Sequence, residues 1–177
     1  YQISQYDLPL CHGGWLDIEV DGAARRIGIT RAHMEEDTAR NTHTIAGGQS
    51  GVDFNRCGLP LLEIVTEPDL RGAREAHAYL TELKQILQYL RVSDCNMEEG
   101  SLRAEANISV RPAGQEAFGT KTEVKNVASF SGVQKAIDFE IARQIAVIEA
   151  GGTVVQETRG WDDAGQRTFV QRKKETA

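Results

Sequence analysis

Long apolar runs are missing from this sequence of 177 residues. No stretch approaches the roughly 20 apolar residues needed to cross a bilayer, and no basic segment followed by an apolar one stands at the start. We therefore expect a soluble, cytoplasmic protein that does not contact a membrane. The 40% hydrophobic and 26% charged residues are ordinary for a globular domain.

Cysteine is scarce as well. Cys11, Cys57 and Cys95 are odd in number, far apart and without C-x-x-C spacing. This pattern indicates neither a disulfide framework nor a zinc ribbon, so we predict three reduced thiols.

An excess of basic residues and the common nucleotide-binding motifs are also lacking. The net charge is −6, whereas a general nucleic-acid surface requires a concentration of Lys and Arg. Any RNA contact would be local, or made by segments outside this sequence. The absence of P-loop, G-x-G-x-x-G, G-x-S-x-G and H-E-x-x-H motifs removes Walker-type NTPases, dinucleotide enzymes, α/β-hydrolases and zincins as interpretations supported by a motif.

The sequence does contain a regular succession of strand patterns in its first part. Apolar and polar residues alternate on both sides of "DGAA" (21–24), which predicts a β-hairpin that runs on towards Glu35. A polar loop is expected over 38–51. The segment "GLPLLEIVTEPD" (58–69) predicts another strand, in which Glu63 lies among apolar residues.

Helical spacing of apolar residues predicts two amphipathic helices. One covers residues 70–91, with Asp69 as its N-cap. The other runs from its N-cap, Ser129, to about Glu149, and the glycines at 151–152 end it. Its apolar positions include Phe130, Val133, Ile137, Ile141, Ile145 and Ile148.

Further alternating segments predict strands around these helices. They are "NMEEGSLRAEANISVRP" (96–112), "GTKTEVKN" (119–126) and a closing hairpin over 156–173. The order of elements predicts an α+β fold, with an antiparallel sheet covered by helices on one face and a polar opposite face.

Polar side chains gather on the strand faces that point away from the core. They are Glu63, Arg103, Glu105, Asn107, Lys121, Glu123 and Lys125, with His33 and Glu35 at the end of another strand. Carboxylates held together repel unless a cation compensates. Mg²⁺ held by Glu35 and Glu63, with Lys and Arg side chains nearby to take phosphate charge, would form a phosphoryl-transfer site.

A simpler interpretation stays open beside this one. Alternating acids and bases also form salt-bridge ladders on a solvated sheet face, worth roughly a few tenths of a kcal/mol per pair, and periodicity does not separate the two cases. "MEEG" (97–100) then is a solvated turn, His33 is a surface histidine, and Arg159 is structural.

Five segments together resemble the B-subunit family of the aspartyl/glutamyl-tRNA amidotransferases. They are "YQISQYDLPL", "IGITRAHMEEDTAR", "DFNRCGLPLLEIVTEPD", "MEEGSLRAEANISVRPAGQEAFGTKTEVKN" and "QETRGWD". The resemblance implies a catalytic cradle domain similar in fold to glutamine synthetase. It implies that ATP and Mg²⁺ activate the side-chain carboxylate of Asp-tRNA(Asn) or Glu-tRNA(Gln), and that ammonia then forms the amide. An amidase partner, the A subunit, would release this ammonia from glutamine, and the small C subunit would bridge the heterotrimer.

The resemblance also assigns residues. It implies Glu35 of "HMEED" and Glu63 of "LLEIV" as metal ligands, with Glu36 as the alternative to Glu35. The catalytic residues implied in the polar cradle are Glu98, Glu99, Arg103, Asn107, Lys121 and Lys125. Those implied to bind the nucleotide are Arg103, Lys121, Lys125 and Arg159.

One departure from the family pattern matters. The family's N-terminal G-L-E-x-H segment, which supplies further metal ligands, is not among these residues. By contrast, "TAR" after "HMEED" and Glu105, where the family usually has "AGK" and Asp, are mild variations. We therefore expect a single cradle domain over residues 1–177 with an incomplete metal site, and C-terminal helical and tail domains elsewhere in the parent protein.

Two other functions remain open at this point. One is a glutamine-synthetase-like ligase or guanidino kinase that acts on a small metabolite. The other is a non-catalytic assembly scaffold whose polar face is only a salt-bridge ladder. Stimulation of ATP turnover by free glutamate or a guanidino compound without tRNA would favour the first, and absence of saturable Mg²⁺–nucleotide binding in the intact subunit would favour the second.

Overall fold

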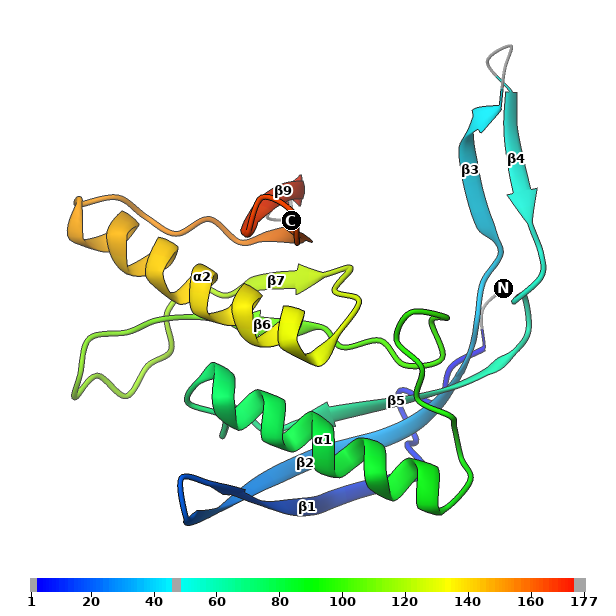
Figure 1. The fold of residues 1–177 in the computed structure, drawn as a ribbon, viewed down its shortest axis with the longest axis horizontal. Coiled ribbons are helices and arrows are strands. Elements are labelled where there is room, and N and C mark those ends of the chain that lie inside the picture. Colours follow the sequence, from blue (N-terminus) through cyan, green and yellow to red (C-terminus); the bar gives the residue numbers. More distant parts are fainter. Residues whose placement is uncertain (1–2, 46–48, 174–177) are drawn as a thin grey trace. The chain divides into compact units, whose positions relative to one another are not determined.

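A computed structural model describes residues 3–45 and 49–173 (Figure 1). Within these ranges the chain forms an α+β fold with two helices, as predicted, and it has nine strands. The strands are β1 (Cys11–Val20), β2 (Ala23–Glu36), β3 (Arg40–Ile45), β4 (Gln49–Asp53), β5 (Pro60–Thr66), β6 (Ala106–Ile108), β7 (Thr122–Lys125), β8 (Glu157–Asp162) and β9 (Arg167–Lys173). The helices are α1 (Ala73–Tyr89) and α2 (Phe130–Glu149).

The chain divides into two compact units. Unit 1 comprises Tyr1–Asp17 and Arg25–Asp69, and unit 2 comprises Ile18–Ala24 and Leu70–Ala177. The strands form three sheets, of orders β1-β2-β5, β3-β4 and β6-β7-β8-β9, rather than the single sheet that we expected. That the 177 residues act as one catalytic domain stays a prediction.

The first hairpin is confirmed. Strands β1 and β2 are neighbours in one sheet, and Asp21 and Gly22 between them have positive φ angles of 54° and 75°. Two consecutive residues in this conformation are typical of the tight turns that match strand twist, and Asp-Gly is a preferred pair there.

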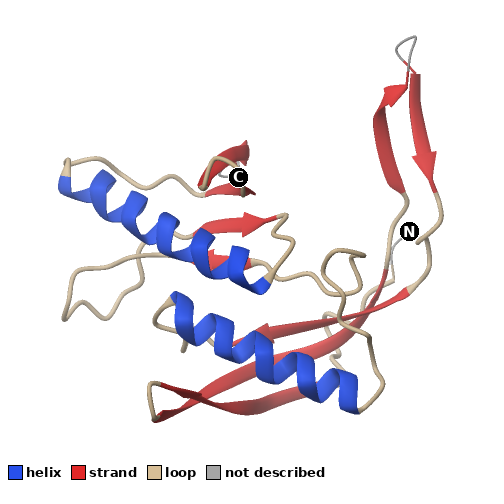
Figure 2. Cartoon of the chain, in the orientation of Figure 1, coloured by secondary structure: helices blue, strands red, loops and turns tan. Residues whose placement is uncertain are grey.

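The prediction of a polar loop over 38–51 is wrong for the residues of that range that the structure describes. Strands β3 and β4 pair antiparallel there, with Arg40 opposite Asp53 and Asn41 opposite Val52, and Figure 2 shows them as an extended hairpin. Backbone hydrogen bonds make this ladder, and they need no alternation of apolar and polar side chains. The pattern on which the prediction depended was therefore uninformative.

The sheet of unit 2 is mixed, not antiparallel as predicted. Strand β7 pairs parallel with β8, while β6 pairs antiparallel with β7 and β9 antiparallel with β8. Helix α2 connects β7 to β8 and lies along this sheet in Figure 1. A strand-helix-strand connection of this kind joins parallel neighbours, whereas we had assumed hairpin connections throughout.

The ends of the helices confirm one capping prediction and correct another. Ser129 Oγ accepts a hydrogen bond from the Gly132 amide at 3.0 Å, as expected for the N-cap of α2. Helix α1, however, begins after Gly72 without a side-chain cap. Asp69 instead accepts a hydrogen bond from the Gly28 amide at 2.8 Å. Its carboxylate is therefore used within unit 1 and does not cap the helix.

The apolar core of unit 2 lies where α1 and α2 pack together and where α2 packs against the sheet (Figure 1). Its buried members are Ala73, Ala76, Ile108, Val124, Val133, Ala136, Ile137 and Trp161. The expected long strand over 96–112 is reduced to β6, but its alternation holds: Arg103, Glu105 and Asn107 are exposed, and Ile108 is buried. In the described ranges neither helix has the length and apolar character of a membrane span.

Candidate functional site

A β-bulge in β2 sets the face on which its polar side chains lie. The pairing of β2 with β5 shifts between Ile29, opposite Thr66, and Arg31, opposite Val65. Adjacent residues of β5 face opposite sides of the sheet, so Ile29 and Arg31 do too. The bulge therefore moves the odd-numbered side chains of β2 to the other face of the sheet.

His33 lies between two carboxylates on this face. Its Nε2 atom is 3.2 Å from Glu35 Oε1 and 3.1 Å from Glu63 Oε2, and Glu63 is its direct partner across the ladder. The hydroxyl of Ser4 donates to the same Glu35 oxygen at 3.1 Å, and Arg31 Nε donates to His33 Nδ1 at 3.3 Å. The His33 side chain is fully buried, while those of Glu35 and Glu63 are 25% and 49% exposed, so His33 is not the surface histidine of the simpler interpretation.

We call Glu35 and Glu63 the acid pair. One oxygen of each carboxylate and a nitrogen of His33 all lie within 4.8 Å of one another. Two negative charges this close repel unless a cation compensates. The residues fit Mg²⁺, which prefers a few carboxylate oxygens and completes its shell with water and phosphate, because both acids keep exposed surface for such ligands.

The register of β2 against β5 also distinguishes Glu35 from Glu36, the two alternative metal ligands. Glu35 lies opposite Leu61 and Glu36 opposite Pro60, and consecutive residues of a strand point to opposite faces. Glu36 is therefore on the face away from Glu63, and the geometry favours Glu35 as the partner of Glu63.

A second group of predicted residues lies on the polar face of the sheet in unit 2. Asn107, Glu123 and Thr158 are register partners across β6, β7 and β8, and the Thr158 hydroxyl donates to Glu123 at 3.0 Å. Lys125 Nζ lies 2.7 Å from Glu105 and 3.6 Å from Glu123. This face is thus a ladder of ion pairs and hydrogen bonds, with an ammonium group at its centre.

Lys125 keeps its charge in this ladder. Partial burial lowers the pKa of its ammonium group, but the hydrogen bond and charge of Glu105 and the charge of Glu123 outweigh burial and raise the pKa above its usual value. The side chain is 35% exposed, so it is a cation that a phosphate group could reach. Arg103 and Lys121, the other two predicted cations of this group, are exposed.

Glu98 and Glu99 lie in a turn. Their amides both donate to the side-chain oxygen of Asn96, at 3.0 and 3.4 Å, and both residues are exposed. The turn follows from Asn96, whose side chain often organises the backbone two and three residues further on. The catalytic roles implied for the two acids stay predictions.

Arg159 lies on the other face of this sheet, the one covered by α2. Its guanidinium group donates from Nε to Thr168 Oγ1 at 2.8 Å, from Nη2 to the Thr168 carbonyl at 3.1 Å, and from Nη1 to Glu157. Only 9% of the residue is exposed. This arrangement favours the structural role, and the implied contact between Arg159 and a nucleotide has no support in it.

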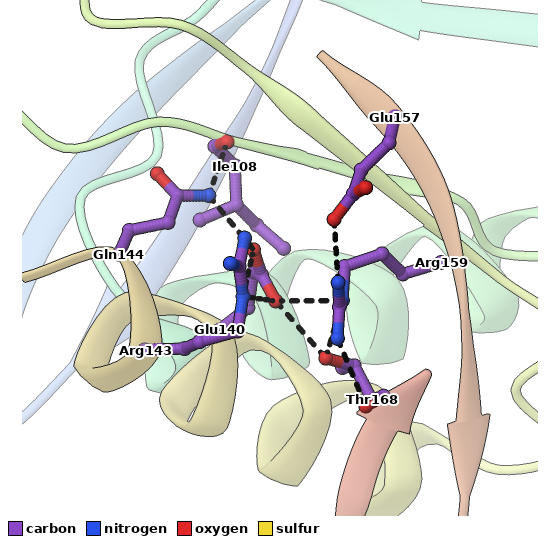
Figure 3. Close-up of polar contacts among 7 residues, drawn as sticks. All are labelled: Ile108, Glu140, Arg143, Gln144, Glu157, Arg159 and Thr168. Atoms are coloured by element: carbon purple, nitrogen blue, oxygen red, sulfur yellow. Dashed lines mark hydrogen bonds and ion pairs between the residues drawn. The ribbon is translucent and has the colours of Figure 1, made fainter. Parts of the chain in front are cut away.

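Helix α2 contributes the rest of this buried network (Figure 3). Glu140 is fully buried and accepts hydrogen bonds from Arg143, Gln144 and Thr168, while Gln144 also donates to the Ile108 carbonyl at 3.0 Å. Burial raises the pKa of Glu140, but the hydrogen bonds and charge of its partners outweigh burial and lower the pKa below its usual value. We refer below to the buried network, whose members are Glu140, Arg143, Gln144, Glu157, Arg159 and Thr168.

Glu140 and Gln144 were not among the residues predicted from the sequence. The apolar positions of α2 were expected to form its buried stripe, yet Ile145 and Ile148 are each 42% exposed. Val133 and Ile137 of the expected stripe are buried, and Glu140 and Gln144 are buried with them. Their spacing of four, three and four residues is itself helical. The sequence signal that could have identified Glu140 and Gln144 was therefore an acid and an amide at positions of the apolar stripe.

The chain thus has an α+β fold, with a candidate magnesium site in unit 1 and a polar, cation-bearing sheet face in unit 2. The family described as GatB/GatE catalytic domain matches residues 1–177, and the chain belongs to that family.

Curated relatives agree with this assignment. Proteins named as the B subunit of aspartyl/glutamyl-tRNA(Asn/Gln) amidotransferase are similar over the whole chain, with 58% identity in Brevibacillus brevis, 61% in Moorella thermoacetica and 59% in Caldicellulosiruptor saccharolyticus. The alignments cover 37%, 38% and 37% of these relatives, so the chain spans less than two fifths of their length.

Proposed function

We propose that this chain carries the site at which a tRNA-dependent amidotransferase activates the carboxylate of a misacylated tRNA. The substrates would be Asp-tRNA(Asn) and Glu-tRNA(Gln), as in the names of the relatives. The observation that carries the proposal is the acid pair, since two partly exposed carboxylates share one buried imidazole. We also propose that the chain belongs to a cytoplasmic cradle similar in fold to glutamine synthetase, and that it works with the amidase, or A, subunit of the complex and with its small C subunit.

The chemistry explains why such a site is needed. A carboxylate is a poor electrophile, so one of its oxygens must first receive the γ-phosphoryl group of ATP before ammonia can displace phosphate and form the amide. Mg²⁺, when bound, would neutralise charge on the phosphates. Glu35 and Glu63 would hold it, and His33 would keep the two carboxylates in place.

Cationic and polar residues of unit 2 would bind the phosphate groups and the substrate. Lys125, Lys121 and Arg103 are cations that would take phosphate charge, and such fixed charges contribute most where water is excluded. Lys125 is held by Glu105 and Glu123, which restricts its side chain before any phosphate arrives. Asn107 would orient a substrate oxygen by hydrogen bonding. Positioning of this kind lowers the barrier without covalent chemistry by the protein.

The test is Glu63→Gln in the assembled, full-length enzyme. The amide keeps the size of the side chain but removes the charge that would fix the metal, so tRNA-dependent ATP hydrolysis and amidation should fall together by ~10²-fold or more. Glutamine hydrolysis, which would belong to the amidase partner, should keep its intrinsic rate.

A matched control is Glu67→Gln. Glu67 follows β5 in the same unit and accepts a hydrogen bond from Thr30 at 2.7 Å, which an amide oxygen can still accept. It should lose less than about 1 kcal/mol of stability and keep its turnover. Near wild-type amidation by Glu63→Gln, in a folded enzyme at saturating Mg²⁺, would remove Glu63 from the site and contradict the proposal.

A further inference from the structure

Residues 110–119 form a closed loop between β6 and β7, drawn in light green in Figure 1. The two ends of the loop touch, because the carbonyl oxygen of Val110 fills the place that a Cβ atom on Gly119 would take. Only glycine fits there without moving the backbone. Short surface loops whose ends meet in this way are frequently functional.

Contacts within the loop hold it in one conformation. The Gln115 amide donates to the Pro112 carbonyl at 3.1 Å, and Arg111 Nη1 donates to the Glu116 carbonyl. Residues 112–118 are nevertheless all exposed. The loop is therefore ordered by its own atoms and presents its side chains to solvent.

An arginine and a phenylalanine stack at the base of this loop. The central carbon of the Arg111 guanidinium lies 4.6 Å from the centroid of the Phe118 ring. Phe118 is 55% exposed, so the ring keeps surface for a second planar group. Aromatic rings and guanidinium planes are the groups on which proteins stack unpaired nucleic-acid bases.

A second exposed stack, in unit 1, differs from this one in its charge. Arg26 lies 4.7 Å from the ring centroid of Trp15, but its Nε and Nη2 atoms both donate to the Asp17 carboxylate, at 2.7 and 2.9 Å. That stack is therefore neutral. In the ranges 3–45 and 49–173 no carboxylate forms an ion pair with Arg111, so its charge is available to an anion such as phosphate.

Lys121 adds another cation close to the stack. It is exposed and lies immediately before β7, three positions after Phe118, so the extended chain between them spans at most about 11 Å. One nucleotide can bridge such a separation, with its base on the ring and a phosphate group at the ammonium.

We propose that Arg111 and Phe118 form a stacking subsite for the adenine base of a nucleotide whose phosphate group lies at Lys121. ATP and the adenosine at the 3′ end of a tRNA both carry this base, and the experiment below distinguishes them. The inference rests on the proposed function for the presence of these two ligands. The ordered loop and its charged stack do not depend on it.

The first arm of the experiment is titration calorimetry of the assembled, full-length enzyme with a non-hydrolysable ATP analogue and, separately, with inorganic tripolyphosphate. If the base of ATP stacks on Phe118, Phe118→Leu should weaken binding of the analogue about 5- to 150-fold, the range that loss of one base–aromatic stack gives. Binding of tripolyphosphate, which has no base, should stay unchanged. Phe118→Tyr keeps the ring plane and should keep the affinity.

The second arm uses deacylated tRNA with and without its terminal adenosine. If the base belongs to the tRNA, Phe118→Leu should weaken binding of the complete tRNA by a similar factor and leave binding of the shortened tRNA unchanged. Trp15→Leu is the matched control in both arms, because it removes the ring of the neutral stack. Melting temperatures establish that each variant is folded.

The outcomes separate this inference from the proposed function. Wild-type affinity of folded Phe118→Leu for both the ATP analogue and the complete tRNA would overturn the subsite. An equal loss in Trp15→Leu, or an equal loss for tripolyphosphate, would overturn it as well, because the effect would not be that of a stacked base. A wild-type enzyme that binds neither the ATP analogue nor tripolyphosphate would instead overturn the proposed function, and the tRNA arm would still decide whether a base stacks on Phe118.

Discussion

The acid pair of unit 1 and the buried network of unit 2 use ionisable side chains in opposite ways. In the network, two acids and two arginines balance in charge, and hydrogen bonds join them across a helix and two strands. In unit 1, two partly exposed carboxylates both contact the same imidazole nitrogen, Nε2 of His33. Removing one partner from balanced, enclosed charges is costly, whereas like charges held together cost free energy unless a cation compensates, which is why we propose a metal site at the acid pair.

The largest effect on stability is expected from Arg159→Met. Removing one partner of a buried ion pair leaves the other uncompensated, so the free energy of unfolding should fall by about 3–5 kcal/mol. Denaturant unfolding of the full-length protein measures this change. Arg167→Met is the control, since Arg167 is 68% exposed and pairs with Asp162 at only 3.6 Å; it should cost less than about 1 kcal/mol. If Arg159→Met kept full stability but lost nucleotide binding, the comparison would be wrong.

A smaller effect should appear in the pH dependence of stability. The pKa of Glu140 is lower in the folded protein than its usual value of 4.5. Its contribution is therefore complete above about pH 4.5 and is lost as the pH falls through the lowered pKa. Glu140→Gln should be less stable at neutral pH and should lose less stability on acidification. Melting temperatures of both proteins between pH 3 and 7, taken at roughly half-unit steps, provide the check; parallel curves would mean that Glu140 does not titrate with folding.

The smallest effect is expected at the start of α2, outside both groups. Ser129→Ala removes the hydroxyl that accepts from the Gly132 amide and should cost about 1 kcal/mol of unfolding free energy. Ser131→Ala, a neighbouring change at an exposed position of the first turn, is the control. A loss at Ser129 as large as that at Arg159 would remove the distinction between an ordinary surface contact and the buried network.

Local patterns predicted much of this fold. The hairpin turn at Asp21, the cap at Ser129 and the exposed side of Arg103, Glu105 and Asn107 all depend on neighbouring residues, and all are confirmed. The resemblance pointed to Glu35 and Glu63, and the structure brings them together.

The remaining features depend on contacts far apart in the sequence. The bulge beside Arg31 exists only because β5 lies alongside β2, and no local pattern specifies it. The parallel pairing of β7 with β8 arises from packing of α2 on the sheet. Glu140 on an apolar stripe indicated a buried partner, but Arg159 follows 19 positions later on another element, so only the folded chain identifies the pair.

Metal binding by the acid pair is tested most directly by titration calorimetry of the full-length protein with Mg²⁺ in the presence of a non-hydrolysable ATP analogue. The proteins to compare are the wild type, Glu35→Gln, Glu63→Gln and, as the control, Glu67→Gln. We predict that each of the first two changes weakens Mg²⁺ binding about tenfold or more, because each removes a charged ligand, and that the control keeps the wild-type affinity. Wild-type affinity in both acid-pair variants, with folding intact, would contradict it.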